Sequence, residues 1–124
     1  MTSQARRVIA VVDDDPGVRA SLRFLLETAG HVVETYDSGV RFLAEADPAR
    51  IACLVLDQQM PSLAGLDLLA RLRAAGVTTP ALLIVSTPAA AVARRAAQLG
   101  VRQVLEKPLA QDDLLARIAA ATAA

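Results

Sequence analysis

The chain alternates short apolar runs with longer segments in which apolar residues recur every three or four positions. The short runs are five or six residues long and rich in Val, Ile and Leu, so they predict strands at 7–12, 32–36, 52–57, 81–86 and 101–105. The periodic segments predict helices at 16–29, 38–46, 65–75, 90–99 and 111–122. A regular alternation of strand and helix is typical of repeated βαβ units and therefore of a parallel sheet.

The residues at the helix ends support this pattern. Asp14 or Asp15 can cap the first helix, Pro16 suits its first turn, and Gly30 stands where a positive φ is usually needed. Within that helix, apolar residues recur on one face: Val18, Leu22, Leu25, Leu26 and Ala29. Three further ends carry similar signals, with Ser38 as a cap and Gly76 and Gly100 as stops.

The strand pattern favours a single doubly wound α/β domain over 1–124, with no output domain within it. The first, third and fourth strands are almost continuously apolar, as expected for a sheet covered on both faces. Five strands with right-handed crossovers favour the order 2-1-3-4-5, for which flavodoxin and CheY are the standard examples. In that order the first and third strands are neighbours at the topological switch point. The second strand lies outside them and ends in turn and cap residues, Tyr36-Asp37-Ser38.

Four of the predicted strands end on residues that can hold a metal ion or a phosphoryl group. The first leads into Asp13, Asp14 and Asp15, and the third ends at Asp57. The fourth ends at Ser86, and the fifth leads into Glu106 and Lys107. Because the carboxyl ends of parallel strands meet at one edge of the sheet, we expect these residues to form one pocket.

The residue types in this pocket indicate phosphoryl chemistry with a hard cation. Asp13, Asp14 and Asp57 would repel one another strongly unless a cation enters, and oxygen ligands without His or Cys favour Mg²⁺ or Mn²⁺. Lys107 and the Ser86 hydroxyl could balance the oxygens of a phosphoryl group. Asp57, the lone acid after a buried strand, is the candidate nucleophile for an aspartyl-phosphate, whereas Asp13 and Asp14 are better placed for metal.

Each of these residues also has a purely structural interpretation. The Asp-Asp-Asp-Pro segment can be a solvated helix start, Asp57 can begin a turn, and Ser86 and Lys107 can be ordinary strand-end and loop residues. Taken separately, these interpretations do not explain why four strands end in such residues at the same edge.

Composition excludes several other classes of protein. The 124 residues carry 13 Lys and Arg against 13 Asp and Glu, which argues against nucleic-acid binding by this segment. No apolar run approaches the roughly 20 residues of a membrane-spanning helix, and the basic segment 1–7 makes a poor signal peptide. The single cysteine, Cys53, lies in an apolar run, where we expect it to be a buried spectator, and suits a cytoplasmic protein.

Across its whole length the chain resembles the receiver domain of two-component response regulators. The motifs that carry the resemblance are Val11-Val12-Asp13-Asp14-Asp15, Asp57-Gln58-Gln59-Met60-Pro61 with Gly65, Ser86 after the fourth strand, and Glu106-Lys107-Pro108. The stretch from Pro16 to Leu22 is most similar to receivers of FixJ-type transcriptional regulators.

The resemblance implies a role for each residue of the site. Asp57 would accept a phosphoryl group from a phosphohistidine on a sensor histidine kinase or phosphotransfer protein. Asp14 and Asp57 would bind Mg²⁺ directly, together with the backbone carbonyl of Gln59, while Asp13 would assist through water. Ser86 occupies the position of the hydroxyl residue that closes on the phosphoryl group. Lys107 would contact that group and usually precedes a cis Lys-Pro bond.

Two departures from the family pattern affect the expected output surface. Val104 stands where the family often has a Tyr or Phe whose movement reports the state of the site. The segment from Ser86 to Gly100 is one residue shorter than in FixJ-type receivers and contains Pro88, so we expect the fourth helix to start late or sit differently. Ser86, rather than Thr87, is our candidate for the hydroxyl residue. Arginines mixed with apolar residues on this face could serve docking or homodimerisation, or belong to an ordinary amphipathic helix: Arg94, Arg95 and Arg102.

One further hypothesis concerns Gln59, whose side-chain amide could orient water for attack on an aspartyl-phosphate. The leading function is thus a phosphorylation-dependent switch rather than an enzyme. Two alternatives remain at this point: a haloacid-dehalogenase-like phosphatase with an Asp nucleophile, suggested by Asp13-x-Asp15, and a receiver-like interaction module that is not phosphorylated. The sequence leaves open whether the chain is a single-domain regulator or the receiver of a longer one.

Overall fold

The computed structural model describes residues 8–122 and contains one five-stranded parallel sheet with the order β2-β1-β3-β4-β5. The strands are β1 (Val8–Val12), β2 (Val32–Tyr36), β3 (Ile51–Asp57), β4 (Ala81–Val85) and β5 (Gln103–Glu106). This is the predicted strand order, with β1 and β3 adjacent and β2 at an edge. The predicted start of the first strand at residue 7 lies outside the described residues.

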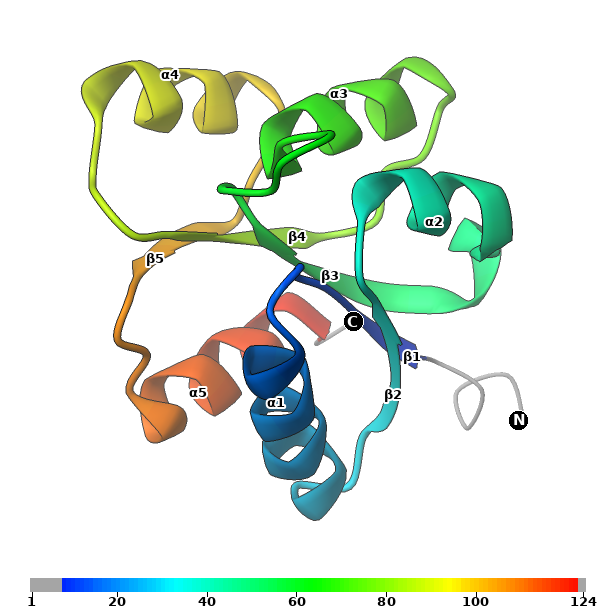
Figure 1. The fold of residues 1–124 in the computed structure, drawn as a ribbon, viewed down its shortest axis with the longest axis vertical. Coiled ribbons are helices and arrows are strands. Elements are labelled where there is room, and N and C mark those ends of the chain that lie inside the picture. Colours follow the sequence, from blue (N-terminus) through cyan, green and yellow to red (C-terminus); the bar gives the residue numbers. More distant parts are fainter. Residues whose placement is uncertain (1–7, 123–124) are drawn as a thin grey trace.

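Helices cover both faces of the sheet (Figure 1). They are α1 (Pro16–Thr28), α2 (Gly39–Glu45), α3 (Gly65–Ala74), α4 (Ala90–Gln98) and α5 (Gln111–Thr122). The helices α1 and α5 lie on one face, and α2, α3 and α4 lie on the other. The fourth helix starts at Ala90, as the apolar period predicts, while its expected difference from FixJ-type receivers stays a prediction. A short 3-10 helix, η2 (Pro48–Arg50), was not predicted because three residues are too few to show a helical period.

The two helical layers explain why the central strands are apolar at every position. Along β1, Ile9 and Val11 pack into the core shared with α1 and α5, whereas Ala10 and Val12 pack into the core on the opposite face. All residues of β1, β3 and β4 are buried. Strands covered on both faces lose the alternation of apolar and polar residues that marks a half-exposed sheet.

The ends of α1 and α2 follow the predicted capping chemistry. The Asp15 carboxylate accepts hydrogen bonds from the N–H groups of Gly17 and Val18, and the Ser38 hydroxyl accepts one from the N–H of Arg41. Gly30 follows α1 with φ 96°. On the apolar face of α1, Leu22 and Leu26 are buried as expected. Ala29, predicted on the same face, is the C-cap residue and is exposed.

The start of β5 differs from the prediction by two residues. The predicted strand at 101–105 begins with Val101, but the N–H of this residue donates to the carbonyl of Ala96 and completes the end of α4. Gly100, with φ 75°, makes the turn that brings this N–H back to the helix. The apolar pattern alone could not separate a residue of the helix end from the first residue of the strand.

Cys53 is fully buried in β3, and burial raises the pKa of its thiol to about 12, so it is a core residue rather than a reactive one. Within residues 8–122, the helices are all too short or too polar to cross a bilayer.

Candidate functional site

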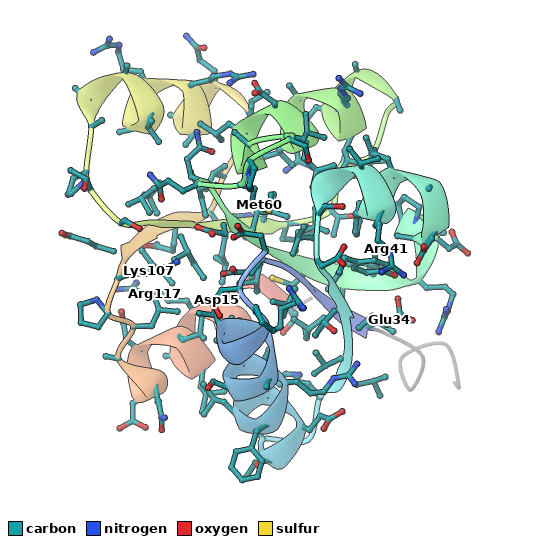
Figure 2. All side chains as sticks on the ribbon, in the orientation of Figure 1. Asp15, Glu34, Arg41, Met60, Lys107 and Arg117 are labelled. Carbon is teal, nitrogen blue, oxygen red and sulfur yellow. The ribbon has the colours of Figure 1, made fainter. Side chains whose placement is uncertain are left out.

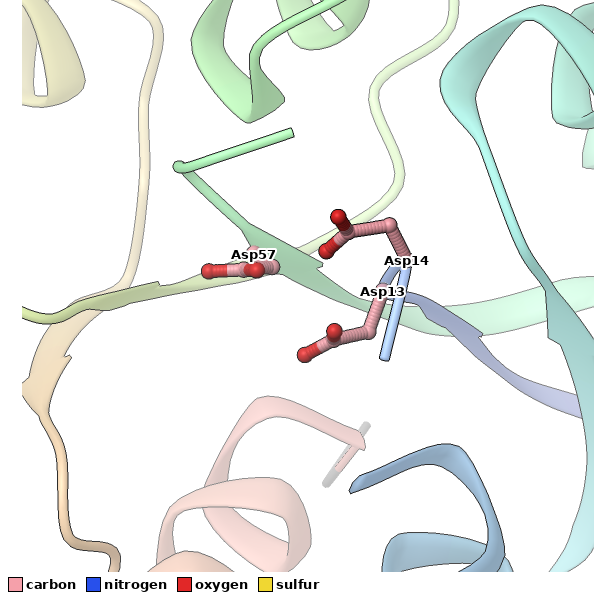
Figure 3. Close-up of side chains that lie close together, drawn as sticks. All are labelled: Asp13, Asp14 and Asp57. Carbon is pink, nitrogen blue, oxygen red and sulfur yellow. The ribbon is translucent and has the colours of Figure 1, made fainter. Parts of the chain in front are cut away.

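Three carboxylates meet at the carboxyl edge of the sheet. Asp13 and Asp14 directly follow β1, and Asp57 is the last residue of β3. Because β1 and β3 are adjacent, one oxygen of each carboxylate lies within 4.8 Å of the others. Figure 3 shows the side chains of Asp13 and Asp14 directed toward the side on which Asp57 lies. The structure thus brings together all three acids that the sequence assigned to this site.

Two of these acids are buried, which makes their negative charge costly. Asp13 is 1% exposed and Asp57 3% exposed, whereas Asp14 is exposed. Burial is the main cause that raises the pKa of the Asp57 carboxyl, and the nearby Asp13 raises it further, while Lys107 lowers it. Burial likewise raises the pKa of Asp13, against a hydrogen bond from the N–H of Asp15. A cation bound beside Asp13 and Asp57 would therefore stabilise the charged form of both carboxylates.

The donor set fits a hard divalent cation. All three side chains offer carboxylate oxygens, which Mg²⁺ and Mn²⁺ prefer. One oxygen of Asp13, Oδ1, accepts the N–H of Asp15 at 2.9 Å. The other, Oδ2, is buried and has no hydrogen-bond partner among residues 8–122. A buried carboxylate oxygen without a donor is the kind of group that a cation or a cation-bound water satisfies.

Lys107 supplies the positive charge of the site. Its backbone N–H donates to the carbonyl of Val85 at 2.9 Å, which fixes the chain where it leaves β5. From there the Nζ atom lies 3.7 Å from Oδ1 of Asp57. Figure 2 shows Lys107 on this segment, and Asp15 at the start of α1. The Lys107–Pro108 peptide bond is cis, as the resemblance implies.

The connection between β3 and α3 is held close to the acidic cluster by a glutamine and a glycine. The side-chain oxygen of Gln58 accepts the N–H of Leu66 at 2.8 Å, in the first turn of α3. A Cβ atom on Gly65 would lie 2.6 Å from the carbonyl oxygen of Asp57 and 3.0 Å from Leu83. Only glycine allows this approach, so Gly65 determines how tightly the chain turns behind the phosphoacceptor candidate.

Ser86 and Gln59 contact each other across the mouth of the site. The side-chain oxygen of Gln59 accepts the backbone N–H of Ser86 at 3.1 Å. The backbone N–H of Gln59 in turn donates to Oδ1 of Asp57 at 3.4 Å. Ser86 and the neighbouring Thr87 are both exposed, on the connection between β4 and α4. Sequence patterns predicted these residues near the site but not the hydrogen bond that joins two of them.

The face formed by α4 and β5 contains a groove next to Val104. This side chain is 40% exposed, and the groove of about 320 Å³ beside it is lined by small and apolar residues: Val85, Pro88, Ala89, Ala90, Val92, Ala93 and Val104. Of the three arginines predicted for this face, Arg95 pairs with Asp67 of α3 at 2.7 Å. Arg94 and Arg102 are exposed.

Two arginines that the sequence did not single out hold other segments of the chain in place by donating to backbone carbonyls. Arg19 in α1 donates from Nη1 to the carbonyl of Asp13 at 2.7 Å and so holds the chain at the end of β1. Arg73 in α3 donates to three carbonyls, those of Leu99, Val77 and Thr79. Helical periodicity can place both residues on a helix, but it carries no signal for contacts with backbone carbonyls elsewhere in the chain.

The fold and the site together define a class of protein. The molecule is a doubly wound α/β domain with a carboxylate cluster and a lysine at the carboxyl edge of its strands. The cluster lies where the strand order reverses, which is where such domains place their ligands.

Comparisons with known proteins assign this class to a family. A sequence profile described as the response regulator receiver domain matches residues 9–119. The transcriptional regulatory protein FixJ of Bradyrhizobium diazoefficiens is 38% identical over 113 residues, which are 91% of this chain and 55% of that protein. The response regulator MprA of Mycobacterium ulcerans is 42% identical over 114 residues, 90% of this chain and 48% of that protein. The chain belongs to the response regulator receiver domain family of two-component systems.

Solved structures agree with this assignment. The FixJ-N crystal structure is 30% identical and superimposes with a TM-score of 0.84, covering 94% of this chain and 93% of that chain. The chain spans about half the length of the two curated relatives named above. The predicted fold and the resemblance to FixJ-type receivers are confirmed, and the haloacid-dehalogenase alternative is not favoured.

Proposed function

We propose that the domain is a phosphorylation-dependent switch that accepts a phosphoryl group on Asp57. The observation that carries this proposal is the buried Asp57 carboxylate, 3.7 Å from the Nζ atom of Lys107 and within 4.8 Å of two further carboxylates. The position of Asp57 at the switch point and the family assignment support the same role. We infer a stoichiometric acceptor rather than an enzyme with sustained turnover of a small phosphate ester.

The residues of the site divide the chemistry among them. A carboxylate oxygen of Asp57 attacks the phosphorus of a phosphohistidine, the phosphorus–nitrogen bond breaks, and the imidazole nitrogen leaves with its electron pair. Lys107 balances charge on the phosphoryl oxygens, and the Ser86 hydroxyl closes on them. Asp14, Asp57 and the carbonyl of Gln59 would hold Mg²⁺ or Mn²⁺ directly, with Asp13 acting through water. A cation held there would neutralise charge that develops during transfer.

We propose that the donor is a sensor histidine kinase or phosphotransfer protein whose phosphohistidine segment lies in a groove beside the site. This groove, of about 690 Å³, lies between α1 and the start of α5 and shares Lys107 with the site. Ser21 lines it on the side of α1. A Ser21→Arg variant should therefore lose transfer from a protein donor but keep phosphorylation by acetyl phosphate, which needs no such groove.

Incubation with acetyl phosphate and Mg²⁺, read by intact mass, tests the proposed acceptor. We expect addition of one phosphoryl group to the wild type and none to Asp57→Asn. Gel filtration of the same samples with beryllofluoride tests homodimerisation through the face that carries Arg94 and Arg102. Equal phosphorylation of Asp57→Asn would exclude Asp57 as the acceptor, and repeated hydrolysis of a phosphate ester would favour an enzyme instead.

A further inference from the structure

The sheet ladder between β3 and β4 ends with an unusual last bond. In this parallel pair the N–H of Leu54 donates to the carbonyl of Pro80, and the N–H of Gln58 donates to that of Ile84. If the ladder continued with the same alternation, its next bond would run from the N–H of Ser86 to the carbonyl of Gln58. That carbonyl instead accepts the N–H groups of Met60 and Gly65, because the chain turns there toward α3.

The side chain of Gln59 replaces the missing backbone acceptor. Its Oε1 atom accepts the N–H of Ser86 at 3.1 Å, so the side-chain amide extends the ladder by one bond beyond the end of the strands. The backbone N–H of Gln59 also donates to Oδ1 of Asp57 at 3.4 Å. One residue therefore contacts both the phosphoacceptor candidate and the first residue of the connection between β4 and α4.

Apart from the bond of the Lys107 N–H to the carbonyl of Val85, which fixes the end of β4, few contacts hold this connection in place. Residues 86–89 are all exposed, and the cap of α4 at Ala89 makes no side-chain hydrogen bond. The helix that follows buries only Ala96. Val104 is too short to pack under the connection as a ring would, and a groove lies there instead. The bond to Gln59 thus holds the N–H side of the Val85–Ser86 peptide, whose carbonyl side is held by Lys107, and it is the hydrogen bond that acts on Ser86 itself.

We propose that Gln59 is a positioning residue that holds Ser86 in the place it occupies before phosphorylation. The proposal rests on the proposed function, in which the Ser86 hydroxyl closes on the phosphoryl group. Because that movement competes with the bond to Gln59, the bond lowers the affinity of the site for a phosphoryl group. Removing the acceptor should raise this affinity by roughly two- to tenfold, the worth of one hydrogen bond between neutral groups.

Gln59→Met tests the restraint directly, since methionine has a similar length and no comparable acceptor. In the protein without ligand, amide hydrogen exchange by NMR should be at least several-fold faster at Ser86 in this variant. The amide of Gln58, which is bound to the carbonyl of Ile84, is the internal control and should not change. Gln59→Glu keeps an acceptor oxygen at the same reach and should keep the protection of Ser86. Unchanged exchange at Ser86 in Gln59→Met would overturn the proposal.

The consequence for the site is measured with beryllofluoride and Mg²⁺ as the probe. Gln59→Met should bind it roughly two- to tenfold more tightly than the wild type. In a Ser86→Ala background, which keeps the N–H but lacks the hydroxyl, the same change should have little effect. Unchanged or weaker binding by Gln59→Met, with a wild type that binds, overturns the inference alone. Failure of the wild type to bind beryllofluoride overturns the proposed function and this inference with it.

These measurements also distinguish two roles of the Gln59 amide: the proposed restraint on Ser86, and the orientation of water for attack on the aspartyl-phosphate. If the amide only orients water, Gln59→Met lengthens the lifetime of the phosphoryl group and leaves both Ser86 exchange and beryllofluoride affinity unchanged. That result would overturn the positioning role.

Discussion

Replacing Asp13 by asparagine should make the metal-free protein more stable. Asp13 and Asp57 are both buried, and their carboxylates lie within 4.8 Å of each other. Two unit charges 4.8 Å apart repel by about 3.5 kcal/mol at an effective dielectric constant of about 20, and by about 0.9 kcal/mol in bulk water. Lys107 offsets part of this repulsion. We therefore expect Asp13→Asn to raise the free energy of unfolding by about 1–3 kcal/mol, which corresponds to roughly 4–12 °C in Tm.

The pH dependence has a defined sign. The folded protein holds the pKa of Asp13 above its usual value, so the folded state binds this proton more tightly than the unfolded chain. The wild type without metal should thus gain stability as pH falls from neutral through the raised folded pKa. The carboxyl of Asp57 contributes with the same sign. Asp13→Asn lacks one of the two groups and should show a weaker dependence.

Urea unfolding followed by circular dichroism, with EDTA and with Mg²⁺, measures both effects. Asp15→Asn is the matched control, because Asp15 is exposed and asparagine caps a helix about as well, so its stability should change by less than about 0.5 kcal/mol. Mg²⁺ at tenfold its Kd should stabilise the wild type by about 1.4 kcal/mol and Asp13→Asn by less. A metal-free Asp13→Asn that is less stable than the wild type at neutral pH would refute the electrostatic argument.

Three further substitutions test contacts around the site by thermal unfolding. Gly65→Ala should lower the free energy of unfolding by about 1–3 kcal/mol and weaken Mg²⁺ binding, because its Cβ would lie 2.6 Å from the carbonyl oxygen of Asp57. Unchanged Mg²⁺ binding would show that the turn can shift freely. Arg73→Met should lower the free energy of unfolding by about 2 kcal/mol, because three carbonyls lose a charged donor. Arg71 is exposed, so Arg71→Met should leave stability nearly unchanged, and equal effects of the two substitutions would contradict the role of Arg73 in binding these carbonyls. Val104→Phe should raise Tm by filling the groove under α4, and a lower Tm would show that the groove cannot accept a ring.

The architecture and the acidic cluster could be predicted because both follow from the strands. Apolar runs covered on both faces identify a parallel sheet, and the strand order then places the residue after each run at one edge. Asp13, Asp14, Asp57 and Lys107 are brought together by that edge alone. Their positions depend on backbone topology, which the pattern of apolar residues encodes.

The hydrogen bonds between side chains and backbone could not be predicted in the same way. The bond from Ser86 to Gln59 exists because the carbonyl of Gln58 is occupied where the chain turns, a detail of one loop path. The three carbonyls bound by Arg73 likewise come from connections whose course no periodicity describes. Val101 looked like a strand residue because an apolar side chain suits both a strand and a helix end.

The weak attachment of α4 bears on how a receiver without the usual aromatic residue could transmit its state. This helix buries only Ala96 fully, and Val92 and Leu99 pack against the core while partly exposed. Its polar links to α3 are the ion pair of Arg95 with Asp67 and the bond from Arg73 to the carbonyl of Leu99, the C-cap residue. Exposed ion pairs such as the first contribute little stability. An element held by so few contacts needs only a small free energy to move. The restraint proposed at Ser86, worth one hydrogen bond, would therefore be large enough to bias α4, and the proposed switch would not require a ring that swings inward.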